Sequence, residues 1–375
     1  MTANRAYRIA AAAIAAVMAA GAEERPLAGI AAEAQVRRVG AVDWDCSLPS
    51  STFFGRHATR SLGPEKFRDR TPYYAQPVGK DKIDYADRTL AEYEREMRHA
   101  IDAGLDYLAY CWYDQVPQPA PDPSAASAPA DPHVHELVRA RLLHARSPLR
   151  DRLHLCAIIV TCHAYSDHEL TALAREMRNP WYEKVGGRPL TYLFQGVGPI
   201  ERLRGICRRE GAGDPYAVLM GDGVFRRLPP KNRAQVQALC AYAFTGDGKD
   251  FAAFTAKAVA ANTARAQLGL PVIPHLATGW DPTPRIEHPV PWVRYARNHS
   301  YQFARTAADF RLMANETKKW IEANAERCPT GHVLAFAWNE FEEGGWICPV
   351  LGSDGQPDTS RCGHFAEAVR ILKGR

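Results

Sequence analysis

Eight short apolar runs recur along the chain, and longer stretches of mixed apolar and polar residues separate them. Their length and their content of aliphatic and aromatic residues predict buried β-strands. The eight runs span residues 36–44, 105–113, 153–162, 190–195, 216–222, 239–246, 270–280 and 332–338.

The stretches between the runs show the spacing of amphipathic helices. In residues 89–104 and 251–269 apolar side chains recur about every 3.6 residues, and each stretch ends on glycine. Residues 303–326 and 364–375 follow the same pattern. Alternating strands and helices predict a parallel sheet with crossover connections, and eight strands are the number that closes a (β/α)₈ barrel.

An open, doubly wound sheet is the alternative fold. That fold usually has a glycine-rich phosphate-binding turn after its first strand. Here the first strand runs into DWDCSLPSSTFF (43–54), which contains no such turn. We therefore predict an α/β fold with a single (β/α)₈ barrel over residues 23–375 and long strand-to-helix loops.

Two segments do not fit the alternation. Residues 115–133 are rich in proline, alanine and aspartate and predict a long exposed loop insert after the second strand. Residues 222–234 predict a second long loop after the fifth strand. Loops that follow strands lie on the catalytic face of such a barrel, so both segments are expected to border a cleft.

The N-terminus has the pattern of a signal peptide. Arg5 and Arg8 precede a short alanine-rich apolar run, and Ala20-Gly21-Ala22 offers a small-residue cleavage site. The run is shorter than the roughly 20 residues that cross a bilayer. We predict that residues 1–22 are removed and that the protein is secreted or periplasmic, without stable membrane insertion.

Composition narrows the range of partners and covalent links. The formal net charge is only +5 and no block of basic residues is present, which argues against nucleic-acid binding. Nine cysteines are an odd number, so at least one is free or pairs between chains. Cys46 with Cys111 and Cys348 with Cys362 are possible disulfides in an exported protein; small buried apolar residues are the alternative.

The predicted carboxyl ends of the strands are rich in aromatic and acidic residues, and active residues gather there in a barrel of this kind. Aromatic faces can stack on sugar rings, while carboxylates and amides bond their hydroxyl groups. Glycoside cleavage also needs two carboxyl groups, which AWNEFEEGGWICP (337–349) supplies. The candidate catalytic pair is Glu340 and Glu343. The candidate substrate-binding residues are Asp43, Trp112, Tyr113, His163, Trp280, Asp281, Arg285, Asn339 and Trp346.

Several motifs resemble those of glycoside hydrolase family 99, the endo-α-mannosidases, and of the related WbsX-type proteins. NEFEEG (339–344) resembles the family's NEWxEG signature, and GWDPTPR (279–285) resembles its GWDNTPR motif. GLDYLAYCWY (104–113) and NPWYEKVGGRPLTYLF (179–194) resemble its second-strand segment and its entry into the fourth strand. The resemblance covers most of the chain after the signal peptide.

The resemblance implies a (β/α)₈ barrel and a retaining hydrolase that acts on internal α-mannosidic bonds. It makes Glu340 the base that takes the proton from the sugar's own 2-hydroxyl group, which attacks the anomeric carbon. It makes Glu343 the acid that protonates the leaving oxygen and later activates water. It also places Trp280, Asp281 and Arg285 beside the cleft.

The sequence departs from the family pattern in four places. Phe341 stands where the signature NEWxEG has its aromatic residue, which is a mild change. Glu342 occupies the variable position and adds a charge, which either shifts the pKa values of its neighbours or faces solvent. DWDCSLP and TCHAYSD replace the expected ends of strands one and three. These strand ends shape substrate recognition, so the barrel and the carboxylate pair carry over more directly than the mannose substrate.

Simpler interpretations stand beside these assignments. Glu340 and Glu343 could form a solvated acidic turn, the tryptophans and Tyr113 could belong to the core, and Asp281 could form a structural ion pair with Arg285. Asn339 orients either a sugar or a glutamate, or it ends a strand. A WbsX-type glycosyltransferase and a non-catalytic carbohydrate-binding barrel are the alternative functions.

No cofactor is predicted. Cys156, Cys162, His163 and His168 do not have the spacing of a zinc finger or ribbon, so we predict no metal. The sequence also has no Gly-x-Ser-x-Gly elbow and no P-loop, which disfavours a serine hydrolase and an NTPase. The expected partner is a carbohydrate substrate.

Overall fold

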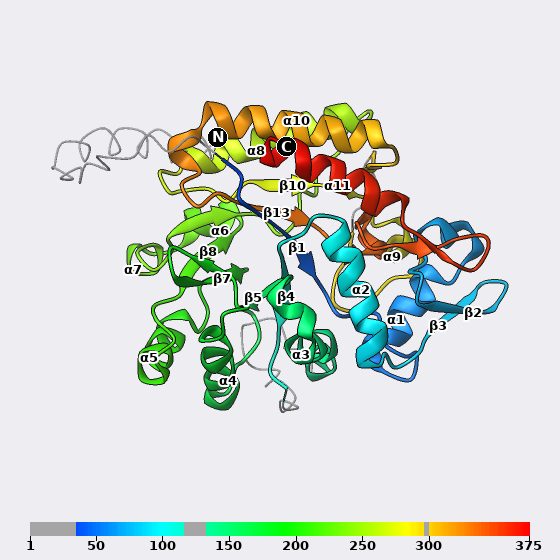
Figure 1. The fold of residues 1–375 in the computed structure, drawn as a ribbon, viewed down its shortest axis with the longest axis horizontal. Helices are drawn as coiled ribbons and strands as arrows, with labels where there is room; N and C mark the ends of the chain where they lie inside the picture. The colour runs from blue at the N-terminus through cyan, green and yellow to red at the C-terminus, as the bar shows by residue number, and fades with distance from the viewer. Residues whose placement is uncertain (1–34, 116–132, 296–299) are drawn as a thin grey trace, which may run out of the picture. The chain divides into compact units, whose positions relative to one another are not determined.

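The computed structural model describes residues 35–115, 133–295 and 300–375 (Figure 1). The predicted signal peptide and nearly all of the predicted loop insert lie outside the described residues.

Eight parallel strands form a barrel, as the sequence predicted. In spatial order they run β10-β13-β1-β4-β5-β7-β8-β9. The Leu239 amide donates to the carbonyl of Pro271 (2.9 Å) and the Ile273 amide donates to that of Leu239 (2.9 Å), which links β9 to the segment that leads into β10. The barrel strands are β1 (Arg38–Asp43), β4 (Tyr107–Trp112), β5 (His154–Val160), β7 (Arg188–Phe194), β8 (Tyr216–Met220), β9 (Ala238–Cys240), β10 (His275–Ala277) and β13 (His332–Phe336).

The barrel strands are buried on both faces, which explains why they read as continuous apolar runs. Inside the barrel the Tyr107 hydroxyl bonds the hydroxyl of Tyr192 (2.9 Å) and the carbonyl of Val333 (3.2 Å). Gly40 on β1 makes room for this arrangement, because a Cβ there would lie 2.2 Å from the Tyr107 ring. The core of the barrel is therefore packed, and its open space lies at the strand ends.

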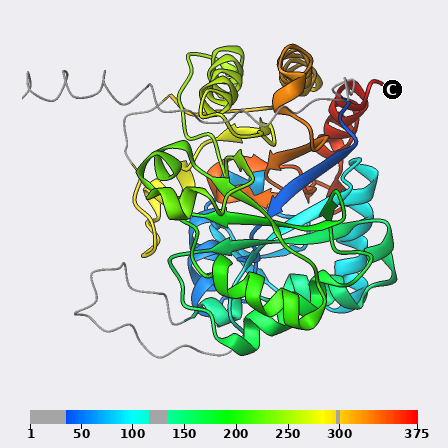
Figure 2. The same ribbon diagram turned by 90° about the vertical axis from the view of Figure 1, so that its left-hand side faces the viewer.

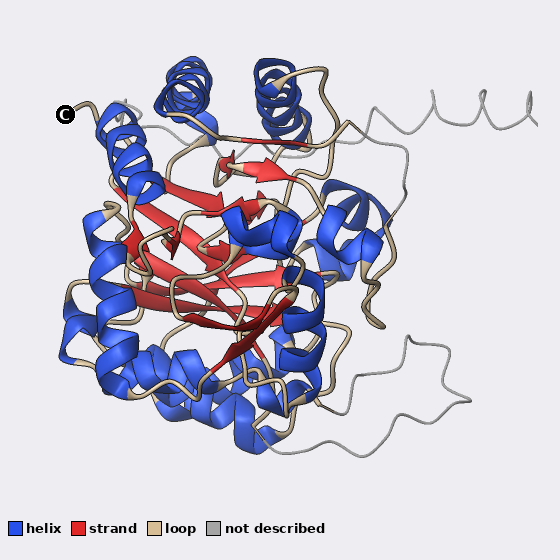
Figure 3. Cartoon of the chain, turned by 90° about the vertical axis from the view of Figure 1, so that its right-hand side faces the viewer, coloured by secondary structure: helices blue, strands red, loops and turns tan. Residues whose placement is uncertain are grey.

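Helices surround the strands (Figure 3). Of these, α2, α8, α10 and α11 confirm the four predicted helical stretches, and α8, α10 and α11 pack together on one side (Figures 1 and 2). Capping boxes at Thr89 with Glu92 and at Thr306 with Asp309 fix the starts of α2 and α10. The outer helices are α2 (Leu90–Asp102), α3 (Arg139–Arg146), α4 (Asp167–Met177), α5 (Ile200–Glu210), α8 (Phe251–Ala266), α10 (Ala307–Ala323) and α11 (Ser360–Lys373).

The sequence pattern did not predict the elements that lie between the first barrel strand and the helix α2, and it predicted a loop after the fifth strand where two short helices form. Between β1 and α2 lie a helix and a hairpin, formed by α1 (Phe53–Leu62), η1 (Glu65–Arg70), β2 (Ala75–Gly79) and β3 (Lys82–Tyr85). The prediction of a plain loop over 222–234 was wrong, because α6 (Asp222–Arg227) and α7 (Pro230–Arg233) form there.

The remaining elements are short. They are η2 (Val134–Glu136), η3 (Pro148–Asp151), β6 (Lys184–Val185), β11 (Gly279–Trp280), α9 (Thr283–Glu287), β12 (Gln302–Phe303), η4 (Ala325–Arg327), β14 (Asn339–Glu340), η5 (Phe341–Glu343), β15 (Gly345–Trp346), β16 (Val350–Leu351) and β17 (Pro357–Asp358).

All nine cysteines are free thiols, so neither suggested disulfide forms. Eight are buried, and Cys162 is exposed. The Cys362 thiol bonds the carbonyl of Ile347 (3.2 Å), and that of Cys111 contacts the Tyr242 hydroxyl (3.7 Å). The cysteines thus act mainly as small buried side chains. Within the described residues, no helix has the length and apolar content to cross a membrane.

Candidate active site

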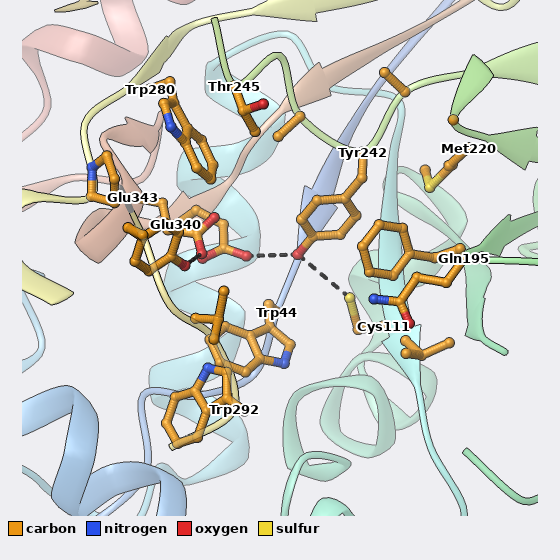
Figure 4. A pocket seen from close by; sticks show the side chains of 18 of the residues that line it. Trp44, Cys111, Gln195, Met220, Tyr242, Thr245, Trp280, Trp292, Glu340 and Glu343 are labelled. Carbon is orange, nitrogen blue, oxygen red and sulfur yellow. Dashed lines mark hydrogen bonds between the residues drawn. The ribbon is translucent and has the colours of Figure 1, made fainter. Parts of the chain in front are cut away.

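A cavity of about 720 Å³ lies at the carboxyl ends of the barrel strands (Figure 4). Its walls combine aromatic rings with a few polar groups, as is typical of small-molecule sites. The aromatic residues are Trp44, Tyr113, Phe194, Tyr242, Trp280, Trp292, Tyr295 and Tyr301. The charged and amide side chains are Gln195, Asp222, Arg265, Arg285, Arg294, Glu340 and Glu343.

A tight turn at the end of β13 positions the two glutamates. Strands β14 and β15 pair antiparallel around η5, which carries Glu343. Gly344 has φ +76°, and a Cβ there would lie 2.5 Å from the Asp281 amide nitrogen. That amide donates to the carbonyl of Glu343 (2.7 Å). The glycine therefore lets the turn pack directly against the segment after β11.

One arginine neutralises part of the charge of three glutamates. Arg285 of α9 is 3% exposed. It ion-pairs with Glu343, donates through Nη2 to Oε2 of Glu342 (2.8 Å), and approaches Oε2 of Glu340 at 3.6 Å. Its guanidinium also lies 4.9 Å from the centre of the Trp44 ring. One positive charge among three buried carboxyl groups favours keeping at least one of them protonated.

Glu340 has few donors around it. The Tyr242 hydroxyl donates to its Oε1 (2.6 Å), while Oε2 is buried and has no hydrogen-bond partner within the described part of the chain. Burial, with the neighbouring charge of Glu343, raises the pKa of Glu340 to about 8. The surroundings of Glu340 thus favour its protonated form more than those of an exposed glutamate do.

Glu343 is better supplied with donors. Both the Arg285 guanidinium and the Tyr295 hydroxyl donate to its Oε1. Burial raises the pKa of Glu343, and the positive charge of Arg285 opposes that rise. Glu343 is also the more exposed of the pair, at 8% against 2% for Glu340.

Glu342 does not face solvent. It is 2% exposed and does not line the cavity. Ser61 of α1 donates to its Oε1, and the Cys46 thiol lies 3.7 Å from its Oε2. The additional carboxylate of the motif is therefore fixed beneath the site, where it holds Arg285.

Comparison with known proteins adds a structural relationship. No protein-family model matches the chain, and no curated protein matches it. A GH99 endo-α-mannosidase of Bacteroides thetaiotaomicron in complex with bis-tris-propane superimposes with a TM-score of 0.56 over 90% of this chain and 96% of that one, at 13% identity. A second structure of the GH99 endo-α-mannosidase from the same organism gives a TM-score of 0.53 over 90% and 97%, at 12% identity. The fold is that of the GH99 endo-α-mannosidases.

Five of the predicted site residues line the cavity of this GH99-like barrel. Glu340 and Glu343 lie side by side, with Trp280 close to them (Figure 4). Tyr113 follows β4, and Arg285 reaches the cavity from α9. The Trp280 ring packs edge-on to Tyr295 with 5.9 Å between centroids, so it belongs to the same aromatic wall.

The other predicted residues lie outside the lining of the cavity. The Trp112 indole donates to buried Glu169 (2.6 Å). Asn339 donates to Asp43 (3.1 Å) and accepts from the Trp44 amide (2.9 Å), so it ties β14 to the end of β1. These contacts fix the strand ends beneath the cavity.

Asp281, Trp346 and His163 are also engaged elsewhere. Asp281 ion-pairs with Arg70, so the alternative of an Asp281–Arg285 pair was wrong. Trp346 is 2% exposed, and its ring lies under the guanidinium of Arg361 at 4.0 Å. His163 packs edge-on to Tyr113, with 5.2 Å between centroids.

Sequence reasoning missed Tyr242, Trp292 and Tyr295. Tyr242 fell inside a run predicted as strand to residue 246, but β9 ends at Cys240. Tyr242 therefore stands at a strand end, where a strand-end search would have found it. Trp292 and Tyr295 follow α9 in a segment without periodicity, and no local signal marks them.

Proposed function

We propose that the protein is an exported glycoside hydrolase, acting on oligosaccharides or polysaccharides, with Glu340 and Glu343 as its catalytic pair. The observation that carries the proposal is the pair itself: two adjacent carboxyl groups in an aromatic-lined cavity, sharing too little positive charge for both to ionise. Such a pair can give one proton and take another in the same step, which glycoside cleavage requires.

The walls of the cavity support a sugar substrate. Trp44, Trp280 and Tyr113 offer aromatic faces for C–H surfaces, and Gln195 and Asp222 offer hydrogen bonds to hydroxyl groups. A volume of about 720 Å³ exceeds the needs of a single sugar ring. We propose endo action on this ground, with α-mannosidic bonds as the first candidates because GH99 endo-α-mannosidases share the fold.

The reaction is proposed to retain anomeric configuration. One carboxyl group of the pair protonates the leaving oxygen, and the other takes a proton from the sugar's 2-hydroxyl group as that oxygen attacks the anomeric carbon. Water then opens the resulting ring, and the two carboxyl groups return to their first state. Arg285 and Tyr295 hold Glu343 in place throughout.

The test is product analysis on an α-mannan and a panel of other polysaccharides, with Glu340→Gln and Glu343→Gln beside the wild type. We expect oligosaccharides from the wild type, with at least about 100-fold slower release by both variants, because each loses a proton-transfer group. Unchanged turnover in both variants would remove them as catalytic groups. Glycan binding by calorimetry without any product would instead favour a non-catalytic carbohydrate-binding protein.

A further inference from the structure

A group of basic residues begins at one wall of the cavity. Met220 at the end of β8 lines the cavity (Figure 4), and the wall continues through Gly221 to Gly223. Helix α6 begins on this wall and α7 follows it, and residues 223–234 contain four basic residues and no acidic one. These four residues are exposed, and we call them the basic rim: Arg226, Arg227, Lys231 and Arg233.

The fold holds the basic rim beside the cavity. A Cβ built on Gly223, which lines the cavity, would lie 3.3 Å from Nη1 of Arg227, so this guanidinium lies against the cavity wall. Arg233 donates to the carbonyl of Arg226 (2.6 Å), and its guanidinium lies 5.6 Å from the centre of the Phe225 ring. These contacts tie α7 to α6. The basic rim is therefore part of the border of the site rather than a distant surface patch.

Few carboxylates offset the charge of the basic rim. Asp222 at the start of α6 pairs with Arg265, with 2.8 Å between Oδ1 and Nε, which compensates its charge. In the described part of the chain, the one ion pair of the rim joins Lys231 to Glu201 of α5 at 3.7 Å. The two side chains of that pair are 78% and 72% exposed, and exposed pairs contribute little. Four positive charges thus have one carboxylate paired with them, an excess of three.

A further cation lines the cavity from another segment. Arg294 follows α9, is exposed, and has no hydrogen bond or ion pair among the described residues. By contrast, the carboxyl groups of Glu340 and Glu343 both have Arg285 beside them. Cations that the protein itself does not pair are available to a ligand, and their strongest hydrogen bonds are those to anionic oxygens.

An anionic membrane surface is the other partner that a basic patch can attract. Proteins that lie on a membrane also insert apolar or aromatic side chains into it. Within the described ranges the exposed large apolar residues are Val78 and Leu142, and neither belongs to α6 or α7. Because the basic rim also continues a wall of the cavity, a charged glycan fits it better than a lipid surface does.

We propose, on the basis of the function proposed above, that the substrate is an anionic glycan whose carboxylate, sulfate or phosphate groups bind the basic rim. The glutamates act on a glycosidic bond of the same glycan chain inside the cavity. Guanidinium groups match the paired oxygens of these anions. Since a polymer repeats its charged groups, the basic rim raises the concentration of substrate at the cavity and speeds its capture.

Salt dependence tests the proposal on the wild type. The probes are a neutral α-mannan and the same α-mannan with a fraction of its primary hydroxyl groups oxidised to carboxylates. The Debye length falls from about 30 Å at 0.01 M salt to about 10 Å at 0.1 M. Over this range we expect KM for the oxidised mannan to rise about 10-fold, with little change for the neutral mannan, because screening weakens only the attraction of charged substrate. Equal salt dependence on both polymers would overturn the proposal.

A triple variant tests which residues are responsible. Arg226→Gln, Arg227→Gln and Lys231→Gln are combined, while Arg233 is kept because it ties α7 to α6. We expect the ratio of kcat/KM on the oxidised mannan to kcat/KM on the neutral mannan to fall about 10-fold, through KM rather than kcat, because capture rather than chemistry is weakened. An unchanged ratio would overturn the role of the rim.

The matched control removes the same charge from the opposite end of the barrel. It combines Arg152→Gln, Arg208→Gln and Arg370→Gln, which replace three exposed arginines. The first precedes β5, and the other two lie near the carboxyl ends of α5 and α11. The ratio of the two kcat/KM values should stay at its wild-type value. Thermal unfolding curves show whether both triple variants are folded in the assay.

A binding measurement separates this proposal from the proposed function. Calorimetry with the Glu343→Gln variant should show tighter binding of the oxidised mannan than of the neutral one, and the triple substitution should remove the difference. Equal binding, or no binding of either polymer, would overturn the anionic-glycan proposal even where the wild type cleaves neutral mannan. Preferential binding without any product from the wild type would support the basic rim and contradict the hydrolase.

Sedimentation with phosphatidylglycerol vesicles tests the lipid alternative. We expect the wild type and the triple variant to remain in solution equally. Binding of the wild type to the vesicles that the triple variant loses, together with equal binding of the two mannans, would assign the basic rim to a membrane surface and overturn the proposal.

Discussion

Replacing Arg285 by methionine should lower the free energy of unfolding at pH 7 by about 3–5 kcal/mol, which is the usual cost of removing one partner from a buried ion pair. Methionine keeps much of the apolar volume of the arginine stem, so packing against Trp44 changes little. The loss comes from the glutamates, which keep their burial but lose their cation. Urea unfolding of variant and wild type measures the difference.

The pH dependence of this loss has a definite sign. Without the cation, the pKa values of Glu340 and Glu343 in the folded state rise further above the unfolded value of about 4.5, so the folded state binds more protons than the unfolded state. Their contribution to stability is then complete below about pH 4.5 and declines as the pH rises. The deficit of Arg285→Met should therefore be smallest in acid and grow toward pH 8.

Arg311→Met is the matched control, because it removes an arginine from a surface pair with Glu367. That change should lower the free energy of unfolding by less than about 1 kcal/mol at every pH. The loss of unfolding free energy in Arg285→Lys should lie between the losses in Arg285→Met and Arg311→Met. Lysine keeps the positive charge, but it cannot donate to two carboxylates at once as the forked guanidinium does. A deficit for Arg285→Met that does not change between pH 5 and pH 8 would contradict this account of the cluster.

The barrel could be predicted because its signal is local. Each of the eight strands is an apolar run buried on both faces, so none depends on distant residues to be recognised. The two catalytic candidates were found for a related reason: they follow the last strand directly, and strand ends in a barrel meet at one face. Gly344, which the turn requires, also stands in the motif.

The remaining parts of the site depend on contacts between distant segments. Arg285 pairs with the glutamates of η5, whereas its sequence neighbour Asp281 pairs with Arg70 far upstream. Tyr295 reaches Glu343 from a segment without periodicity. Partner choice of this kind is set by three-dimensional packing, and the sequence pattern contains no signal for it.

The second large loss of stability is expected from replacing Glu183, which lies at the amino-terminal end of the barrel. It accepts hydrogen bonds from Arg38 at the start of β1, His154 at the start of β5 (3.0 Å) and His332 at the start of β13 (2.9 Å). One carboxylate thus joins three strands, and it is 2% exposed. Glu183→Gln should cost about 3 kcal/mol in unfolding free energy at pH 7, because three donors lose a charged acceptor.

The pH dependence here has the opposite sign to that at Arg285. The hydrogen bonds from His154 and His332, together with Arg38, hold the pKa of Glu183 well below its usual range. Its contribution is therefore complete above the unfolded value of about 4.5 and is lost as the pH falls toward the lower folded value. The difference in unfolding free energy between wild type and Glu183→Gln should therefore decrease steadily as the pH falls below about 4.5.

Urea unfolding between pH 3 and pH 7 measures this gap, with Glu210→Gln as the control, since Glu210 pairs with exposed Arg175. The control should stay within about 1 kcal/mol of wild type throughout. Turnover at pH 7 should be unaffected in both variants while they remain folded, because Glu183 and Glu210 lie outside the cavity lining. A constant gap from pH 7 to pH 3 would mean that the carboxylate charge of Glu183 does not tie the three strands together.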